Sequence, residues 1–216
     1  MTTRVMLVAL TMLGPLLGLP SVDPAGSVYT REPVPSTYTA RLAPVPLNGA
    51  SATGADGVLT LTLQGTTAHI TEDVHRLAAI FESQPYPHLQ QIHGLRNGIC
   101  PTVAADANND GVISGAEAEP QYGPALTTLS MIGDTSPATA TNAWQEPPGS
   151  SYHYSRTIPL NSRTMEAIRD GTAVIVIDGL DPATTAPSAT TRSSVLAPAL
   201  PLEVTAPALC GALIAG

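Results

Sequence analysis

Six residues in one short stretch have the types and spacing of a calcium-binding loop. Residues 106–117 read Asp-Ala-Asn-Asn-Asp-Gly-Val-Ile-Ser-Gly-Ala-Glu and match the required residue at every position of the twelve-residue pattern. Calcium takes roughly six to eight oxygen ligands, and a Gly in mid-loop permits the sharp turn that wraps the chain around the ion. The expected ligands are Asp106, Asn108, Asp110, the carbonyl of Val112, Ser114 and Glu117. The alternative is an acidic turn without metal, since Asn, Asp and Gly favour turns.

The loop resembles that of an EF-hand, but its flanks differ. Residues 99–103 contain a Pro and β-branched residues where an EF-hand has a helix, and Pro120 is expected to end any following helix after one turn. We therefore expect a calcium loop inserted in another fold. Its ion would stabilise structure and would not drive a sensor-like opening of helices.

The N-terminal segment has the features of a secretory signal. Arg4 precedes an apolar run that is shorter than the roughly twenty residues of a membrane span. We predict a signal peptide over residues 1–25, with an uncertain cleavage site, a Pro-rich tether over 26–36, and a single domain over 37–216. The expected location is secreted or the cell envelope, with no membrane span after cleavage; an uncleaved anchor is the alternative.

Charge and cysteine content narrow the partners and the compartment. The net charge of -8 and the absence of Lys argue against nucleic acid and are compatible with cation binding. Cys100 and Cys210 are the only cysteines. In an oxidising compartment we expect them to form a disulfide, with two free buried thiols as the alternative. Nothing in the sequence indicates the oligomeric state.

Alternating and apolar runs predict an all-β sandwich or barrel. Residues 181–201, rich in Pro and Thr, are expected to be a long surface loop or a partly disordered excursion. Residues 161–170 carry the one clear helix signature, capped by Asn161 or Ser162 and ended by Gly171. Residues 77–82 could form a short helix, and the pattern alone leaves this open. Residues 172–178 form the strongest predicted strand, which we expect to be central. The other predicted strands are 37–42, 58–63, 68–75, 125–132, 152–158 and 208–214.

Short motifs resemble two β-sandwich families. Residues 38–42, the turn at 54–57, residues 58–63 and the Gln-Ile-His-Gly segment at 91–94 are similar to the CHRD domain. Ile92-His93, the Asn-Gly-Ile-Cys segment at 97–100 and residues 209–214 are similar to the copper/zinc superoxide dismutase sandwich. These resemblances imply a Greek-key-type sandwich with the calcium loop inserted, and the second also implies a bridge between Cys100 and Cys210.

The dismutase resemblance does not extend to a full set of copper ligands. His93 is retained, but Gln91 and Asp178 stand where that family has ligand histidines. Copper prefers several nitrogen ligands, so Cu2+ is an unfavoured cofactor. His88 and His93 form a possible second metal site, completed by His153 or His69; hydrogen-bonded structural histidines are the alternative.

Other chemistry has little support in the sequence. Common hydrolase and nucleotide-binding motifs are missing. The acids at Glu72-Asp73 and at Asp178 and Asp181 are expected to be solvated charges and not a catalytic pair. The leading hypothesis is a non-enzymatic calcium-binding β-domain in which calcium and a disulfide fix one surface excursion. A divergent dismutase-like copper enzyme and a calcium-dependent adhesion module that binds an envelope protein or glycan are the alternatives.

Overall fold

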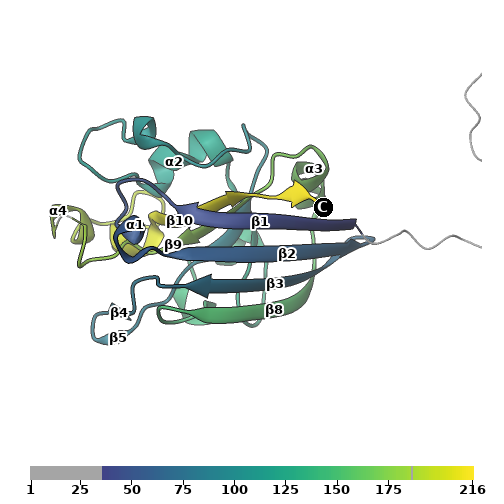
Figure 1. Ribbon diagram of the computed structural model, residues 1–216, viewed down its shortest axis with the longest axis horizontal. Helices are drawn as coiled ribbons and strands as arrows, with labels where there is room; N and C mark the ends of the chain where they lie inside the picture. The colour runs from purple at the N-terminus through teal and green to yellow at the C-terminus, as the bar shows by residue number, and fades with distance from the viewer. Residues whose placement is uncertain (1–35, 186) are drawn as a thin grey trace, which may run out of the picture. The chain divides into compact units, whose positions relative to one another are not determined.

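The computed structural model describes residues 36–185 and 187–216 (Figure 1). The predicted signal peptide, and all but the last residue of the predicted tether, lie outside the described residues. The described chain is mostly β, as the sequence predicts. Its main sheet has nine antiparallel strands in the order β7-β6-β9-β10-β1-β2-β3-β8, with β11 paired to β1. The bounds are β1 Ser36–Pro44, β2 Asp56–Gln64, β3 Thr67–His75, β6 Gln90–His93, β7 Ala125–Thr128, β8 Tyr152–Pro159, β9 Val174–Asp178, β10 Pro207–Ala212 and β11 Ile214–Ala215.

Period-two alternation builds the near layer of this sheet. In β2 the buried Leu59, Leu61 and Leu63 alternate with more exposed Thr residues, so one face of the strand enters the core. Strand β3 places Leu61 opposite Ile70, and β8 continues the layer on the other side of β3. The strands predicted from alternation here are confirmed.

The sheet curls into a half-barrel whose two ends approach each other. Figure 1 shows β1, β2, β3 and β8 in front, with β9 and β10 behind them. The hydroxyl of Tyr152 on β8 donates to Oε1 of Gln90 on β6 at 3.1 Å. Arg156 on β8 donates from Nη1 to the carbonyl of Ser130, just after β7, at 2.6 Å. Side-chain bonds thus join strands that share no backbone pairing in the sheet order.

Strands β9 and β10 form the centre of the molecule, because both their faces are covered. All five residues of β9 are buried, which confirms the prediction of a central strand. Ile175 and Ile177 belong to the main core, while Val174 and Val176 pack on the other side with Ile113 and Tyr122. The disulfide predicted between Cys100 and Cys210 is present and ties this outer layer to β10.

The prediction of one short helix was wrong, although the predicted helix itself is confirmed. Helix α3, Ser162–Arg169, is capped by Asn161, whose side chain accepts from the Thr164 amide at 3.0 Å. Further helices are α1 Ala50–Thr53, α2 Gly115–Tyr122, α4 Pro187–Thr190 and α5 Leu202–Thr205, and single 3-10 turns are η1 Val103–Ala105, η2 Pro137–Thr139 and η3 Ala143–Gln145. These elements lie in connections, where sequence periodicity is too short to reveal them.

One segment that the sequence left open is now settled, and one expectation needs correction. Residues 77–82 are not a helix; they lead into a hairpin of β4, Ile80–Phe81, and β5, Gln84–Pro85, whose turn residues Glu82 and Ser83 have positive φ. The strand predicted over 125–132 ends at Thr128, because Ser130 and the following residues turn to bind Asp134 and Arg156.

The Pro- and Thr-rich segment 181–201 is more than a surface loop. It contains α4 and a bridge between Ser193 and Pro201. Ala189 is buried against Val112 of the predicted calcium loop, with Leu180, Leu202 and Ala206. The segment therefore packs onto the calcium loop and covers it.

Candidate functional site

The predicted calcium loop lies between the 3-10 turn η1 and helix α2. The helix that follows it spans Gly115–Tyr122, so the expectation that Pro120 ends it after one turn was wrong. Proline removes only its own amide from the helical bonds. The amide of Ala118 still donates to Ser114 at 3.0 Å, and that of Gly123 to Glu119 at 2.8 Å, so the turns on both sides of Pro120 close. As predicted, the loop has no full helix in front of it.

In the first half of the loop, side-chain oxygens accept hydrogen bonds from the loop's own backbone amides and hold the turn. The carboxylate of Asp106 accepts from the amides of Asp110 and Gly111 at 3.1 and 3.0 Å. Oδ1 of Asn108 accepts from the Asp110 amide at 2.8 Å, and Oδ1 of Asp110 accepts from the Val112 amide at 3.0 Å. Gly111 has a φ of 84°, the left-handed region that glycine occupies without a steric penalty. Three of the expected ligands thus already line one tight turn.

Glu117 closes the loop from its far end. Ser114 and Glu117 form a capping box at the start of α2: Oε2 of Glu117 accepts from the amide of Ser114 at 2.9 Å and from its hydroxyl at 2.7 Å. Oε1 lies 3.4 Å from the amide of Asn108. The helix start therefore holds the carboxylate of position 12 against position 3 of the loop.

Asp110 has a competing partner in the segment that covers the loop. Nη1 of Arg192 lies 2.5 Å from Oδ2 of Asp110. Partial burial would raise the pKa of Asp110, but hydrogen bonds from Arg192, Asn108 and Val112 outweigh it and hold the pKa below its ordinary value. In the described part of the chain, no three His, Cys, Asp or Glu side chains are gathered as a metal site. The loop carboxylates face backbone amides and Arg192.

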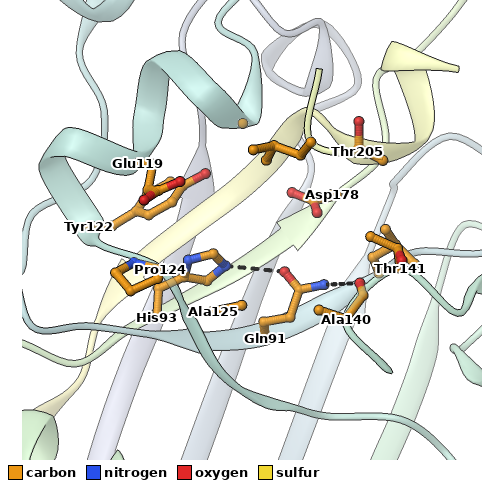
Figure 2. Close-up of a pocket in the computed structure, with 13 residues that line it drawn as sticks. Gln91, His93, Glu119, Tyr122, Pro124, Ala125, Ala140, Thr141, Asp178 and Thr205 are labelled. Atoms are coloured by element: carbon orange, nitrogen blue, oxygen red, sulfur yellow. Dashed lines mark hydrogen bonds between the residues drawn. The ribbon is translucent and has the colours of Figure 1, made fainter. Parts of the chain in front are cut away.

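A pocket of about 200 Å³ adjoins the predicted calcium loop (Figure 2). Gln91 and His93 enter it from β6, Asp178 from the end of β9, and Tyr122 from α2. Gly115, Glu119, Leu196 and Thr205 complete the side nearest to the loop. The structure thus brings together Gln91, His93 and Asp178, the three positions that the dismutase resemblance aligned with ligand histidines.

Both ring nitrogens of His93 face oxygen atoms that accept hydrogen bonds, but a neutral imidazole carries only one N–H donor. Nδ1 lies 2.8 Å from the carbonyl of Gly123, and Nε2 lies 3.1 Å from Oε1 of Gln91. The amide nitrogen of Gln91 donates to Ala140 at 2.9 Å, so rotating that amide only moves the conflict to Ala140. Burial lowers the pKa of His93 to about 4 and outweighs the bond to Gly123. The ring is therefore neutral. If Nδ1 donates to Gly123, the lone pair of Nε2 faces the lone pairs of Oε1 of Gln91.

Asp178 points into the same pocket and is not the solvated charge that we expected. Its side chain is 7% exposed, and burial, with the charge of Glu146, raises its pKa well above the ordinary value. No hydrogen bond links its carboxyl to another described residue. Glu72 and Asp181, also expected to be solvated, are 0% and 8% exposed. For Glu72 the sequence carried the signal, because Ala68, Ile70, Glu72 and Val74 occupy one face of a strand by alternation.

The other histidines do not join His93. His88 is buried, with Nδ1 3.0 Å from the carbonyl of Asp178 and Nε2 2.9 Å from that of Ala78. Burial lowers its pKa, and a neutral ring donates to only one of these two carbonyls. Both nitrogens face backbone carbonyls and not another histidine. His69 and His153 are exposed on β3 and β8, where they contact Thr157 and Asp73. The predicted second metal site from these histidines is not assembled among the described residues.

Comparisons with known proteins identify no relative: no protein-family model matches the chain, and no curated protein matches it. One structural fact bears on location. The disulfide is compatible with an extracellular compartment. Within residues 36–185 and 187–216, no helix is both long and apolar enough to cross a membrane.

Proposed function

We propose that the protein is a secreted or cell-envelope β-domain that binds one calcium ion at residues 106–117 and has no catalytic role. The ion would be held by Asp106, Asn108, Asp110, the carbonyl of Val112, Ser114 and Glu117. We further propose a CHRD-like or superoxide dismutase-like Greek-key sandwich, supported by short motifs that fall in β1, β2, β6 and β10. A partner on the envelope, whether protein or glycan, stays a prediction.

The observation that carries the proposal is the position of Glu117. A calcium loop must close its oxygen shell from the side opposite the first ligands. Here the capping box on α2 holds Glu117 across the loop, 3.4 Å from the amide of Asn108. The side chains of Asp106, Asn108 and Asp110 wind the opposite half. Metal binding would need only local side-chain rotations, including release of Asp110 from Arg192.

The site is expected to be weak and structural. A single loop without a paired EF-hand belongs with extracellular modules, whose dissociation constants lie at about 0.1 to 1 mM. Ions at about ten times the dissociation constant would stabilise the fold by about 1.4 kcal/mol, since a ligand that binds only the folded state adds RT ln(1 + [L]/Kd). The ion would fix the excursion that also carries Cys100.

A thermal melt tests the proposal. The mature domain should gain several degrees in Tm across a calcium series to several millimolar, relative to chelator. An Asp106→Ala, Glu117→Gln variant should show no gain. Glu166→Gln, which removes one exposed carboxylate on α3, is the control for loss of surface charge away from the loop and should respond as the wild type does. If wild type and loop variant respond equally, calcium acts elsewhere and the proposal fails.

The pocket favours a second candidate function, a divergent copper site. Nε2 of His93 and Oε1 of Gln91 are two acceptors 3.1 Å apart, and a cation bound by both would remove their conflict. A ligand histidine usually donates its other nitrogen to a carbonyl, as Nδ1 of His93 does to Gly123. Asp178 would supply a carboxylate. With one imidazole, this set fits copper less well than a site of several histidines would.

Copper loading in the presence of a competing weak chelator tests this candidate. The wild type should retain Cu2+ after dialysis, with an electron paramagnetic resonance spectrum that shows coupling to one imidazole nitrogen. His93→Gln should lose that signal, whereas His153→Gln, which alters an exposed histidine, should keep it. Retention of the same signal in His93→Gln would eliminate the pocket as the copper site.

A further inference from the structure

Inside the half-barrel, two carboxyl groups and a phenol have no hydrogen-bond partner. Glu72 and Tyr154 are both fully buried and lie opposite each other in the β3–β8 register. Glu146, 5% exposed, comes from the connection between η3 and β8. Both oxygens of Glu72, both oxygens of Glu146 and the hydroxyl of Tyr154 lack any bond to the described residues. Buried polar atoms without partners are rare in folded proteins and commonly mark a bound water or ion.

The neighbouring polar groups are already committed. Tyr152 donates to Oε1 of Gln90, and Nε2 of Gln90 donates to the carbonyl of Leu129 at 2.6 Å. The backbone amide of Gln90 is near enough to Glu146 to lower its pKa, but not in hydrogen-bonding geometry. Arg156 points both ends of its guanidinium at the carbonyls of Ser130 and Gly133. No described cation forms an ion pair with Glu72 or Glu146.

The two carboxyl groups are coupled through space. Burial, together with the charges of Asp73 and Glu146, raises the pKa of Glu72 to about 8. Burial likewise raises the pKa of Glu146 to about 8. Both acids also raise the pKa values of Tyr152 and Tyr154. The acids are thus close enough to repel, yet no hydrogen bond joins them, and protonation would give each carboxyl a donor without an acceptor.

We propose that Glu72, Glu146 and the hydroxyl of Tyr154 hold a hard divalent cation, calcium or magnesium, in a site separate from residues 106–117. The unpartnered groups offer five oxygens and no nitrogen or sulfur, which is the ligand set of a hard cation. Two carboxylates balance the charge of a divalent ion, and bridging water would complete its shell. The proposal uses none of the loop ligands and stands if the loop binds nothing.

The connection that carries Glu146 offers a reporter. Trp144, the only Trp in the chain, lies in η3 two residues before Glu146 and is 96% exposed. Ion binding at Glu146 should then change the fluorescence of Trp144.

Proton release gives the site a signature that the loop lacks. An ion must displace the protons of Glu72 and Glu146 below about pH 8, so its affinity should rise about tenfold or more per pH unit from pH 6 to pH 8. The other titratable groups around the pair are Asp73, Asp178, Tyr152, Tyr154 and Arg156.

The test uses the mature domain with Asp106→Ala and Glu117→Gln, so that the loop contributes nothing. Equilibrium dialysis against calcium at pH 8, and separately against magnesium, should leave one ion per chain, and weaker binding at pH 6. Terbium luminescence excited through tyrosine should report the same site. Adding Glu72→Gln or Glu146→Gln should abolish binding; glutamine copies the shape of the protonated acid, and a melt confirms that the fold survives. Glu166→Gln is again the control.

Two results would overturn the proposal. One is a folded loop variant that binds neither calcium nor magnesium at pH 8. The other is ion binding that survives both Glu72→Gln and Glu146→Gln. The Glu72→Gln variant with an intact loop separates failure of this site from failure of the loop site. If the loop binds calcium, the melting temperature of this variant still rises with calcium.

Discussion

At the residue scale, Asn48 contributes more to the calcium loop than its position in the sequence suggests. It is fully buried between α1 and β1. Its Nδ2 donates to the carbonyls of Ile113 and Pro207 at 2.8 and 2.6 Å, and its Oδ1 accepts from the Ile113 amide at 2.8 Å. One side chain therefore fastens the second half of the loop to the start of β10.

Asn48→Ala should destabilise the domain and weaken calcium binding together. Three buried backbone groups would lose their partner, at about 1 to 3 kcal/mol each when nothing replaces it, so we expect a total loss of at least about 3 kcal/mol. Urea unfolding in chelator measures that loss, and a calcium titration of the melt measures the affinity. Asn97→Ala, an exposed asparagine, should change neither. An Asn48→Ala protein with unchanged calcium response would show that Ile113 needs no such anchor.

At the element scale, the sequence predicted what is local and missed what depends on distant partners. Strands β2, β3 and β8 follow period-two alternation, and α3 follows its cap, so their residues sufficed. The order in which β9 lies between β6 and β10 joins segments far apart in the chain. No local pattern encodes that strand order. Because a sandwich family is defined by its strand order, periodicity alone could not test the resemblance to such families.

The candidate sites divide in the same way. The loop at 106–117 was readable because its ligands are consecutive, whereas Arg192 meets Asp110 from 82 residues away. Gln91, His93 and Asp178 share a pocket only because β6 pairs with β9. Glu146 could not be linked to Glu72 from sequence, since Glu72 lies on β3 and Glu146 lies in the irregular connection before β8. Chemistry carried by one turn is predictable; chemistry assembled across the sheet is not.

At the scale of the whole molecule, several constraints act on one excursion. The chain between β6 and β7 contains Cys100, the proposed calcium loop and α2. The disulfide, Asn48 and the segment 181–201 attach it to β10 and to the outer face of β9. A calcium ion would add a fourth attachment. The half-barrel core of β1, β2, β3 and β8 shares none of these, so the two regions should differ in their response to calcium and to reduction.

Removal of the disulfide tests that division. A Cys100→Ala, Cys210→Ala variant frees a closure of 110 residues, and in the chain-entropy model it should lower the free energy of unfolding by about 5 kcal/mol. Hydrogen exchange should speed up most in α2 and the loop, and calcium should restore part of their protection, because local opening of the excursion competes with ion binding. The hydrogen-exchange rates of amides in β2 and β3 should change only as much as the global stability of the domain changes. Wild-type protein reduced under mild conditions is the control. It lacks the disulfide but keeps both cysteine side chains, so it separates loss of the bond from loss of side-chain volume. Equal acceleration in α2 and β2 would mean that the excursion opens only when the whole domain unfolds.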